Sequence, residues 1–204
     1  MDILCHRGFW ENSTQKNTLK SFKKAFMNDF GIEIDVRDLN EEIVISHDIP
    51  NIGNSKLEDL LMEDLHHDKT LAFNIKSDGI SSKLKELIEK FNITKYFCFD
   101  MSVPQQLHYQ KNQLIWYSRF SDHVEEQVIN KDSDGVWLDC FYSDWWNGED
   151  LKQIAQVKPV VIVSPELHGR NHHIMWKEIK NMGDLNNILL CTDLPEEAKS
   201  FFYD

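Results

Sequence analysis

Eight main hydrophobic runs recur along the chain, and a segment with helical periodicity follows each one. The runs centre near residues 3, 33, 73, 98, 115, 137, 162 and 190. Strict alternation of short strands and helices predicts a parallel sheet, because each helix carries the chain back to start the next strand in the same direction. Eight such units in 204 residues predict a compact (β/α)8 TIM barrel, with a doubly wound parallel sheet as the alternative.

Helices are expected where apolar residues recur three and four positions apart. The first is expected to begin near Asn17 or Thr18, either of which would serve as its N-cap. Later helices are expected over 57–65, 80–91, 124–130, 149–157, 174–182 and 195–202, with a further one that has Pro104 near its start. No linker or composition shift divides the chain, so a single domain over 1–204 is expected.

Charged residues alternate with apolar ones in the segment 31–37, which places Glu33 and Asp35 on the same face of a strand. A solvated surface strand would show the same pattern. Two further features favour a functional site: the next apolar run ends in His47, and the first apolar run ends in His6. Two neighbouring acids with two histidines at strand ends make a candidate metal and acid–base site.

Other polar residues follow later strands, where a parallel barrel places its catalytic face at the C-terminal strand ends. They are Asp100, Asp193, Asn74, Lys76, Asp139, Glu166, His168 and Arg170. The last four line a substrate pocket in one interpretation, with Arg170 binding a second phosphate or a carboxylate. In the other interpretation they form loop ion pairs, which contribute little to stability. The adjacent pairs His66–His67 and His172–His173 are interpreted as surface residues that point to opposite sides of an extended chain.

The net charge is −12, from 22 basic and 34 acidic residues, so the overall field does not attract nucleic acid or anionic lipid. An anionic substrate would therefore need a local cation, such as a metal ion, Arg7, Lys76 or Arg170. The four cysteines form no CxxC pair and lie in apolar runs, which indicates small buried thiols in a reducing compartment. We expect a cytoplasmic protein, because the N-terminus has no signal-peptide pattern and no apolar run approaches the ~20 residues of a transmembrane segment.

The ordered set HRG (6–8), NTLKSFKKAF (17–26), GIEIDVRD (31–38) and IVISHD (43–48) resembles the glycerophosphodiester phosphodiesterase family. That family belongs to the phosphatidylinositol-phospholipase-C-like barrels. The resemblance covers residues 3–48 well and segment 71–76 loosely, and 191–195 looks like the family's last strand end. The middle of the chain matches only in its alternation of strands and helices. The resemblance implies a metal-dependent phosphodiesterase.

The resemblance also implies roles for particular residues. His6 and His47 would be the acid–base pair, Glu33 and Asp35 would bind the metal, and Arg7 would contact the phosphate. Oxygen ligands favour one divalent cation, Mg²⁺ or Ca²⁺, over zinc. We assign His6 to the nucleophile and His47 to the leaving group, because imidazole exchanges protons near neutral pH.

The chain departs from the family pattern at several positions. Asn74 stands where the family usually has an acid as the third metal ligand, two residues before Lys76; an amide oxygen can still bind a hard cation. The lost negative charge predicts weaker metal binding or a different metal preference. Lys16 replaces the acid that usually precedes the Asn-Thr pair, and 164–170 replaces a tryptophan-led motif. The short connection 49–70 lacks the larger insertion that helps to hold glycerol, which bears on the substrate more than on the reaction class.

Three functions follow as hypotheses. The first is a metal-dependent phosphodiester hydrolase that acts on a small phosphodiester or a phospholipid-headgroup substrate. The second is a lyase, in which a substrate hydroxyl attacks and a cyclic phosphate forms. The third is a catalytically impaired barrel that binds a phosphorylated ligand without turnover, which the asparagine at the metal position motivates. The sequence makes no prediction of the oligomeric state.

Overall fold

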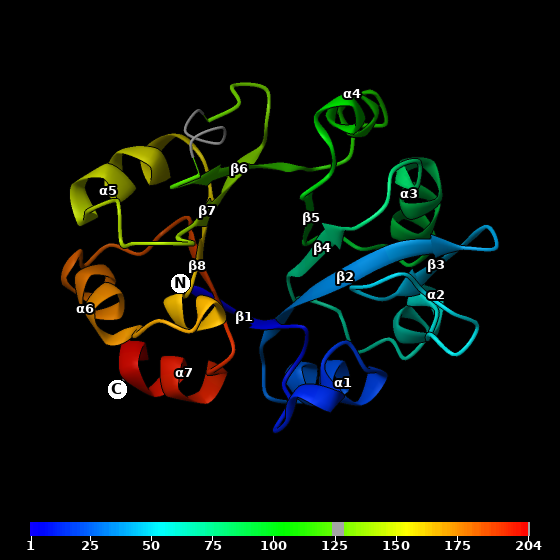
Figure 1. The fold of residues 1–204 in the computed structure, drawn as a ribbon, viewed down its shortest axis with the longest axis horizontal. Coiled ribbons are helices and arrows are strands. Elements are labelled where there is room, and N and C mark those ends of the chain that lie inside the picture. Colours follow the sequence, from blue (N-terminus) through cyan, green and yellow to red (C-terminus); the bar gives the residue numbers. More distant parts are fainter. Residues whose placement is uncertain (124–128, 204) are drawn as a thin grey trace. The chain divides into compact units, whose positions relative to one another are not determined.

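Strands and helices alternate along most of the chain in a computed structural model, which describes residues 1–123 and 129–203 (Figure 1). The eight main strands are β1 (Asp2–His6), β2 (Gly31–Leu39), β4 (Leu71–Ile75), β5 (Tyr96–Phe99), β6 (Tyr117–Ser121), β7 (Gly135–Asp139), β8 (Val160–Val163) and β9 (Ile188–Thr192). The helices are α1 (Leu19–Met27), α2 (Leu57–Leu61), α3 (Ser81–Lys90), α4 (Val103–Lys111), α5 (Gly148–Val157), α6 (His173–Asn181) and α7 (Pro195–Tyr203). Most of the helix expected over 124–130 lies outside the described residues.

The chain groups into two compact units, which are described separately. In the unit Cys5–Trp116, the strand order is β5–β4–β2, with parallel pairing, and β3 (Glu42–Ile45) pairs antiparallel with β2. In the unit formed by Met1–Leu4 and Tyr117–Asp204, β6, β7, β8 and β9 pair in that order and all in parallel. Parallel strands alternating with helices are the predicted (β/α)8 pattern. The single domain stays a prediction.

Burial of the strands explains their uniform apolar composition. Every residue of β8, Val-Val-Ile-Val, is buried, as expected for a parallel strand that is covered on both faces. The helices bury one face only; α1 buries Phe22, Ala25 and Phe26 and exposes its lysines or leaves them half-buried. Full burial of a side chain such as Phe22 contributes about 1.5–3 kcal/mol to folding. Within the described residues, no helix combines the length and apolar content needed to cross a membrane.

The sixth strand is shifted from its predicted position, 114–117. The ladder with β7 runs from Tyr117 to Ser121, whereas Trp116 makes only an isolated bridge to Cys98. The prediction was wrong because β6 is polar, Tyr-Ser-Arg-Phe-Ser, while the buried residues Leu114 and Trp116 precede it without forming a ladder. The apolar run therefore precedes the strand and does not form it.

The helix expected over 57–65 is also shorter than predicted, because α2 ends at Leu61. Asp64 has a left-handed backbone with a φ of 57°, which no α-helix continues through. The apolar periodicity extends beyond the helix into a loop.

A turn at Asn40–Glu41 joins β2 and β3 into a hairpin (Figure 1). Both residues have left-handed backbones, with φ values of 50° and 66°, as a type I′ hairpin turn requires. The hairpin extends β2 to Leu39, so Glu33 and Asp35 lie in the middle of a strand and not at its end.

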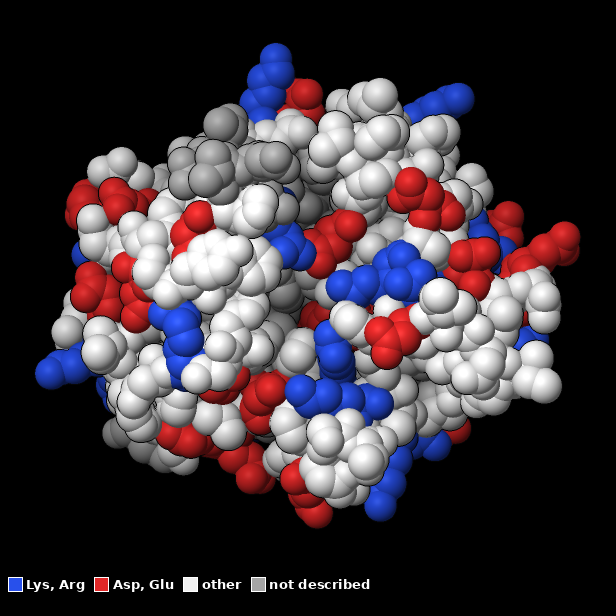
Figure 2. Space-filling model, viewed as in Figure 1, with Lys and Arg blue, Asp and Glu red and all other residues white. Residues whose placement is uncertain are grey.

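Charges of both signs occur on the surface despite the net charge of −12. On the face shown in Figure 2, lysine and arginine side chains are interspersed with acidic ones. Any attraction of an anion must therefore come from a local arrangement of cations and not from the overall field.

Candidate functional site

The His-Arg-Gly turn at the end of β1 has a backbone that only certain residues tolerate. His6 is the last residue of β1, and Arg7 and Gly8 follow with φ values of 56° and 90°. A Cβ atom at Gly8 would lie 2.8 Å from the Cβ of Ser21 in α1. The turn therefore needs glycine for both its φ angle and its close packing against α1, and this packing fixes the position of the Arg7 backbone.

Glu33 and Asp35 on β2 are buried together, with 1% and 0% of their surface exposed. Arg7 contacts both: its backbone N–H donates to Glu33 Oε2 at 3.1 Å, and its Nε lies 2.9 Å from Asp35 Oδ2. Asn74 on β4 donates from Nδ2 to Glu33 Oε1 at 2.9 Å. In the parallel register, Asp35 pairs with Asn74. The structure thus brings together the four predicted residues Arg7, Glu33, Asp35 and Asn74.

Further contacts to Asp35 come from Asn17, which the sequence did not assign to the site, and from the predicted site residue Lys76. Asn17 donates from Nδ2 to Asp35 Oδ2 at 2.8 Å and accepts from the Asp35 N–H at 3.3 Å, while Thr18 is the N-cap of α1. Lys76 Nζ lies 3.5 Å from Asp35 Oδ1 and 3.6 Å from Asp100 Oδ2. Asp100 directly follows β5, as Lys76 follows β4, and the sequence placed both among the polar residues at strand ends without predicting their contact.

Two buried oxygen atoms of this cluster fit a cation. Asp35 Oδ1 and Asn74 Oδ1 are both buried and have no hydrogen-bond partner among the described residues. Burial raises the pKa of Glu33, and the charge of Asp35 raises it further, against the opposing effects of His6, the Asn74 hydrogen bond and Arg7. A nearby cation would favour the ionised form of Glu33. Because the available donors are all oxygens, Glu33, Asp35 and Asn74 suit a hard divalent cation.

The His47–Asp48 turn is attached to the same strand. The Ser46 N–H donates to the backbone oxygen of Asp35 at 3.1 Å, and Arg37 Nε donates to the backbone oxygen of His47 at 3.0 Å. His47 Nδ1 lies 2.9 Å from Asp48 Oδ1, and this hydrogen bond, with the charge of His47, lowers the pKa of Asp48. The contact orients an imidazole ring that is 45% exposed, which leaves His47 accessible to a ligand.

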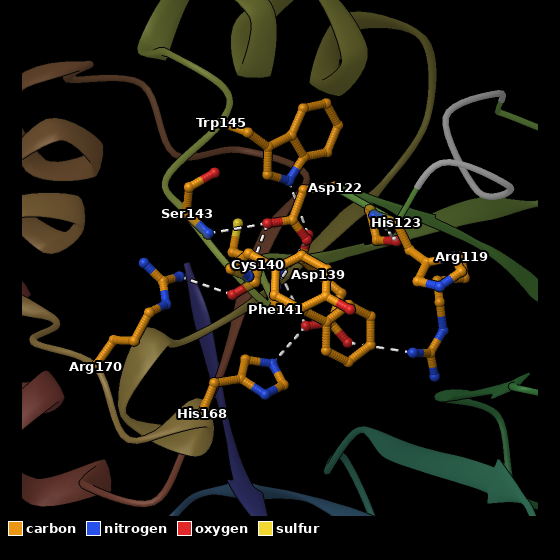
Figure 3. Close-up of polar contacts among 12 residues, drawn as sticks. Arg119, Asp122, His123, Asp139, Cys140, Phe141, Ser143, Trp145, His168 and Arg170 are labelled. Atoms are coloured by element: carbon orange, nitrogen blue, oxygen red, sulfur yellow. Dashed lines mark hydrogen bonds and ion pairs between the residues drawn. The ribbon is translucent and has the colours of Figure 1, made fainter.

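A second polar cluster lies in the other unit, around Asp139 at the end of β7 (Figure 3). His168 Nε2 lies 2.7 Å from Asp139 Oδ1, and Arg119 Nη1 lies 3.5 Å from Asp139 Oδ2. The Phe141 ring contacts both partners, with its centroid 4.9 Å from that of His168 and 5.3 Å from the Arg119 guanidinium carbon. The structure thus brings the predicted residues Asp139 and His168 into contact. Arg119 was not predicted, because it lies in β6, whose polar sequence did not indicate a strand.

Asp122 organises the loop that carries Phe141. Its carboxylate accepts hydrogen bonds from three consecutive backbone N–H groups, those of residues 141–143, at 2.8–2.9 Å (Figure 3). Burial raises the pKa of Asp122, but these hydrogen bonds outweigh it and the net pKa is lowered. Trp145 then donates from Nε1 to the backbone oxygen of Asp139 at 2.9 Å, which closes the loop.

Glu166 and Arg170 make contacts that differ from those of the Asp139 cluster. Arg170 donates to Asp144 Oδ1 at 2.8 Å and to the backbone oxygen of Cys140 at 2.7 Å. Both oxygens of Glu166 accept hydrogen bonds from the ends of β8 and β9, namely from the Ser164 hydroxyl, the Thr192 hydroxyl and the Asp193 N–H. These contacts hold loops together, as in the loop interpretation of the sequence, and their part in substrate binding stays a prediction.

Two further groups of side chains could each hold a metal ion: His66 and His67 with Asp64, and His172 and His173 with Glu197. The interpretation as surface residues holds for His67 and His173, which are exposed, but was wrong for His66 and His172 and for the direction of the rings. The ring centroids of the two pairs lie 4.9 Å and 4.3 Å apart, and His66 and His172 are buried. At the second pair the rings can converge because His172 has a helical backbone and His173 begins α6.

The arrangement of the whole chain is similar to that of solved glycerophosphodiester phosphodiesterase structures. A protein of Galdieria sulphuraria, provisionally named a glycerophosphodiester phosphodiesterase, matches 100% of this chain and 98% of its own with a TM-score of 0.76 at 17% identity. Glycerophosphodiester phosphodiesterases from Parabacteroides distasonis (TM-score 0.64, 15% identity, 99% and 96% covered) and Agrobacterium tumefaciens (0.68, 13%, 98% and 98%) also match. The likeness confirms the predicted (β/α)8 barrel fold. No protein-family model matches the sequence, and no curated protein matches it significantly.

Proposed function

We propose that the protein is a metal-dependent phosphodiester hydrolase of the glycerophosphodiester phosphodiesterase type. The observation that carries this proposal is the buried cluster of Glu33, Asp35 and Asn74, in which two oxygen atoms lack a hydrogen-bond partner among the described residues. The cluster lies beside the cationic side chains of Arg7 and Lys76. The fold of the solved structures supports the same reaction class, since those proteins are named for it.

Glu33, Asp35 and Asn74 would hold one divalent cation, Mg²⁺ or Ca²⁺. When bound, such a cation stabilises the negative charge that builds on the non-bridging phosphate oxygens. Arg7 would contact the phosphate while its backbone N–H keeps Glu33 in place. Lys76, which already lies near Asp35 and Asp100, would add a further positive charge at the phosphate.

The two histidines would move the protons of the reaction. His6 would accept a proton from the attacking water, and His47 would donate one to the leaving alkoxide. Asp48 would orient His47 through the contact at Nδ1, so that Nε2 is left for the substrate. Asp139, His168, Glu166 and Arg170 would contribute to substrate binding.

Binding of a phosphorylated ligand without turnover is the second candidate function, and one contact favours it. The Asn74 amide donates to Glu33, so the cluster has an internal hydrogen bond where a third carboxylate would repel Glu33. A cluster that is stable without a cation would still bind an anion through Arg7 and Lys76. The two candidate functions differ in whether a cation is required.

Hydrolysis of a chromogenic phosphodiester, measured with EDTA, Mg²⁺ or Ca²⁺, tests the proposal. We expect turnover only with a divalent cation, and a loss of about 10²–10⁴-fold in kcat for His47→Ala. His108→Ala is the matched control, because His108 is an exposed histidine on α4. Turnover that persists in EDTA, or an active His47→Ala variant, would contradict the mechanism. Phosphorus NMR of the product separates hydrolysis from the lyase, which would release a cyclic phosphate.

The cysteines support a cytoplasmic location as part of the proposal. Cys5, Cys98, Cys140 and Cys191 are all buried, and none takes part in a disulfide. Burial raises the pKa of the Cys140 thiol to about 12 and also raises that of Cys98, so neither forms a reactive thiolate at neutral pH. Such thiols are typical of a reducing compartment.

A further inference from the structure

A polar pocket of about 650 Å³ opens beside Arg7 and His47 within the unit Cys5–Trp116. Its walls come from three segments of the chain: the loop before α1, the end of β3 with the following histidine turn, and the loop 53–55. This volume is in the range that holds a small organic ligand. The pocket is therefore large enough for a substituent of a phosphodiester as well as for its phosphate.

Hydrogen bonds hold the walls of this pocket in place. Asn54 donates from Nδ2 to the backbone oxygen of Ile45 at 3.0 Å, and the Ile45 N–H donates to the backbone oxygen of Ser55 at 2.9 Å. On the opposite segment, the Asn17 N–H donates to the backbone oxygen of Arg7 at 2.9 Å. Hydrogen bonds thus connect the segments that form the pocket. Ligand binding would therefore lose little conformational entropy through the ordering of loops.

The charge of the lining is opposite to that of the whole chain. Arg7, Lys16 and His47 line the pocket, and none of the described residues that line it is acidic. The chain as a whole carries −12. Lys16 Nζ lies 4.3 Å from the centre of the Trp10 ring, and this cation–π contact holds the ammonium group against Trp10. Serine and asparagine side chains, from Ser13, Asn54 and Ser55, add hydrogen-bonding groups.

We infer that this pocket binds the arm of the substrate beyond the reacting phosphate, and that this arm carries a second anionic group bound by Lys16. The inference rests on the proposed function and names its substrate class: a phosphodiester with an additional carboxylate or phosphate. Arg7 is engaged with Asp35, where the reacting phosphate would bind, whereas Lys16 lines the pocket further along the same loop. A neutral arm would displace water from the Lys16 ammonium group without replacing the hydrogen bonds of that water. An anionic arm would replace them with a charge-assisted hydrogen bond.

Three p-nitrophenyl phosphodiesters that differ only in the second arm test this inference. The arms are butyl, 3-carboxypropyl and 3-phosphopropyl, which are neutral, carboxylate-bearing and phosphate-bearing. We expect the anionic esters to have kcat/KM values about tenfold above that of the butyl ester, mainly through KM, and higher salt to reduce the preference. The ester with the larger preference identifies which anion the pocket fits.

Lys16→Gln should lower the ratio of anionic to neutral kcat/KM about tenfold, to near one. Lys20→Gln is the matched control, because Lys20 is a neighbouring exposed lysine that does not line the pocket. Turnover of the butyl ester without an anionic preference, or a preference that Lys16→Gln leaves intact, overturns the inference and leaves the hydrolase proposal standing. If no ester is hydrolysed, the hydrolase proposal fails. Calorimetric titration of the same esters into the wild-type protein and Lys16→Gln then decides whether Lys16 selects anions.

Discussion

Replacing Asn74 with aspartate tests whether the Asn74 side chain stabilises Glu33 through its amide N–H and binds a cation through its oxygen. In the wild-type chain, the Asn74 amide donates to Glu33 Oε1 at 2.9 Å, and its Oδ1 has no hydrogen-bond partner among the described residues. The Asn74→Asp variant loses the donor and gains a negative charge beside two buried carboxylates. We expect the metal-free variant to be less stable and its response to a divalent cation to be larger.

The size of the effect follows from the lost contact. A hydrogen bond to a charged group contributes about 1.5–3 kcal/mol, and a third buried carboxylate adds repulsion to that loss. In a protein of this length, 1 kcal/mol corresponds to about 2–4 °C in Tm, so the metal-free variant should melt about 3–12 °C below the wild type. A cation at a hundred times its Kd restores about 2.7 kcal/mol.

Thermal unfolding in EDTA measures the loss of stability without metal, and unfolding with increasing Mg²⁺ or Ca²⁺ measures the stabilisation by the cation. Asn92→Asp is the control, because it adds the same charge at an exposed position outside the cluster. We expect Asn74→Asp alone to have a lower Tm in EDTA and a larger cation-induced rise than the wild type. Equal Tm values in EDTA, together with equal cation-induced shifts, would refute the assignment of Asn74 to the metal site.

Three further variants test other parts of the structure. Gly8→Ala should lower the free energy of unfolding, measured in urea, by about 3 kcal/mol, because it combines a φ of 90° with a clash against Ser21; Gly79→Ala, with a φ of 86° and open space, should cost about 1 kcal/mol. Equal losses would show that the clash has no effect. The raised pKa of Glu33 stabilises the metal-free protein below the ordinary pKa of 4.5, and this stabilisation is lost as the pH rises through the folded-state pKa. Glu33→Gln should therefore raise the Tm in EDTA at pH 8, and a lower Tm would contradict it. The lowered pKa of Asp122 stabilises the fold above its ordinary pKa of 3.8, and that contribution is lost as the pH falls through the folded-state pKa. Asp122→Asn should thus flatten the acid dependence of tryptophan fluorescence, and an unchanged acid transition would refute this account.

The fold was predictable because its signal is local and repeated. Each buried strand is a short apolar run, and each helix has an apolar stripe, so the alternation is visible without any long-range contact. The prediction was wrong at β6, where the ladder is formed by polar residues and backbone hydrogen bonds hold the strand. It was also wrong at the end of α2, because apolar periodicity does not report the left-handed backbone of Asp64.

The candidate site was predictable to the extent that its residues are neighbours in sequence. The spacing of Glu33 and Asp35 places them on one face of β2, and the structure confirms that both are buried together. Asn17 was assigned only a capping role, because its contact with Asp35 joins residues 18 positions apart. Asp100 reaches the cluster through Lys76, a pairing that depends on the order of the strands and not on any local pattern.

The charge balance of the cluster explains why an asparagine at position 74 has opposite effects on a cation and on an anion. Three carboxylates, Glu33, Asp35 and Asp100, lie with two permanent cations, Arg7 and Lys76, so the cluster carries one net negative charge when all are ionised. A divalent cation reverses that sign, and a phosphodiester monoanion then neutralises it. An acid at position 74 would hold the cation more tightly but leave the loaded cluster without the positive charge that attracts the substrate. We therefore expect Asn74→Asp to lower the Kd for the cation and to raise the KM for a phosphodiester at saturating cation. A variant in which both constants moved in the same direction would show that charge does not control binding at this cluster.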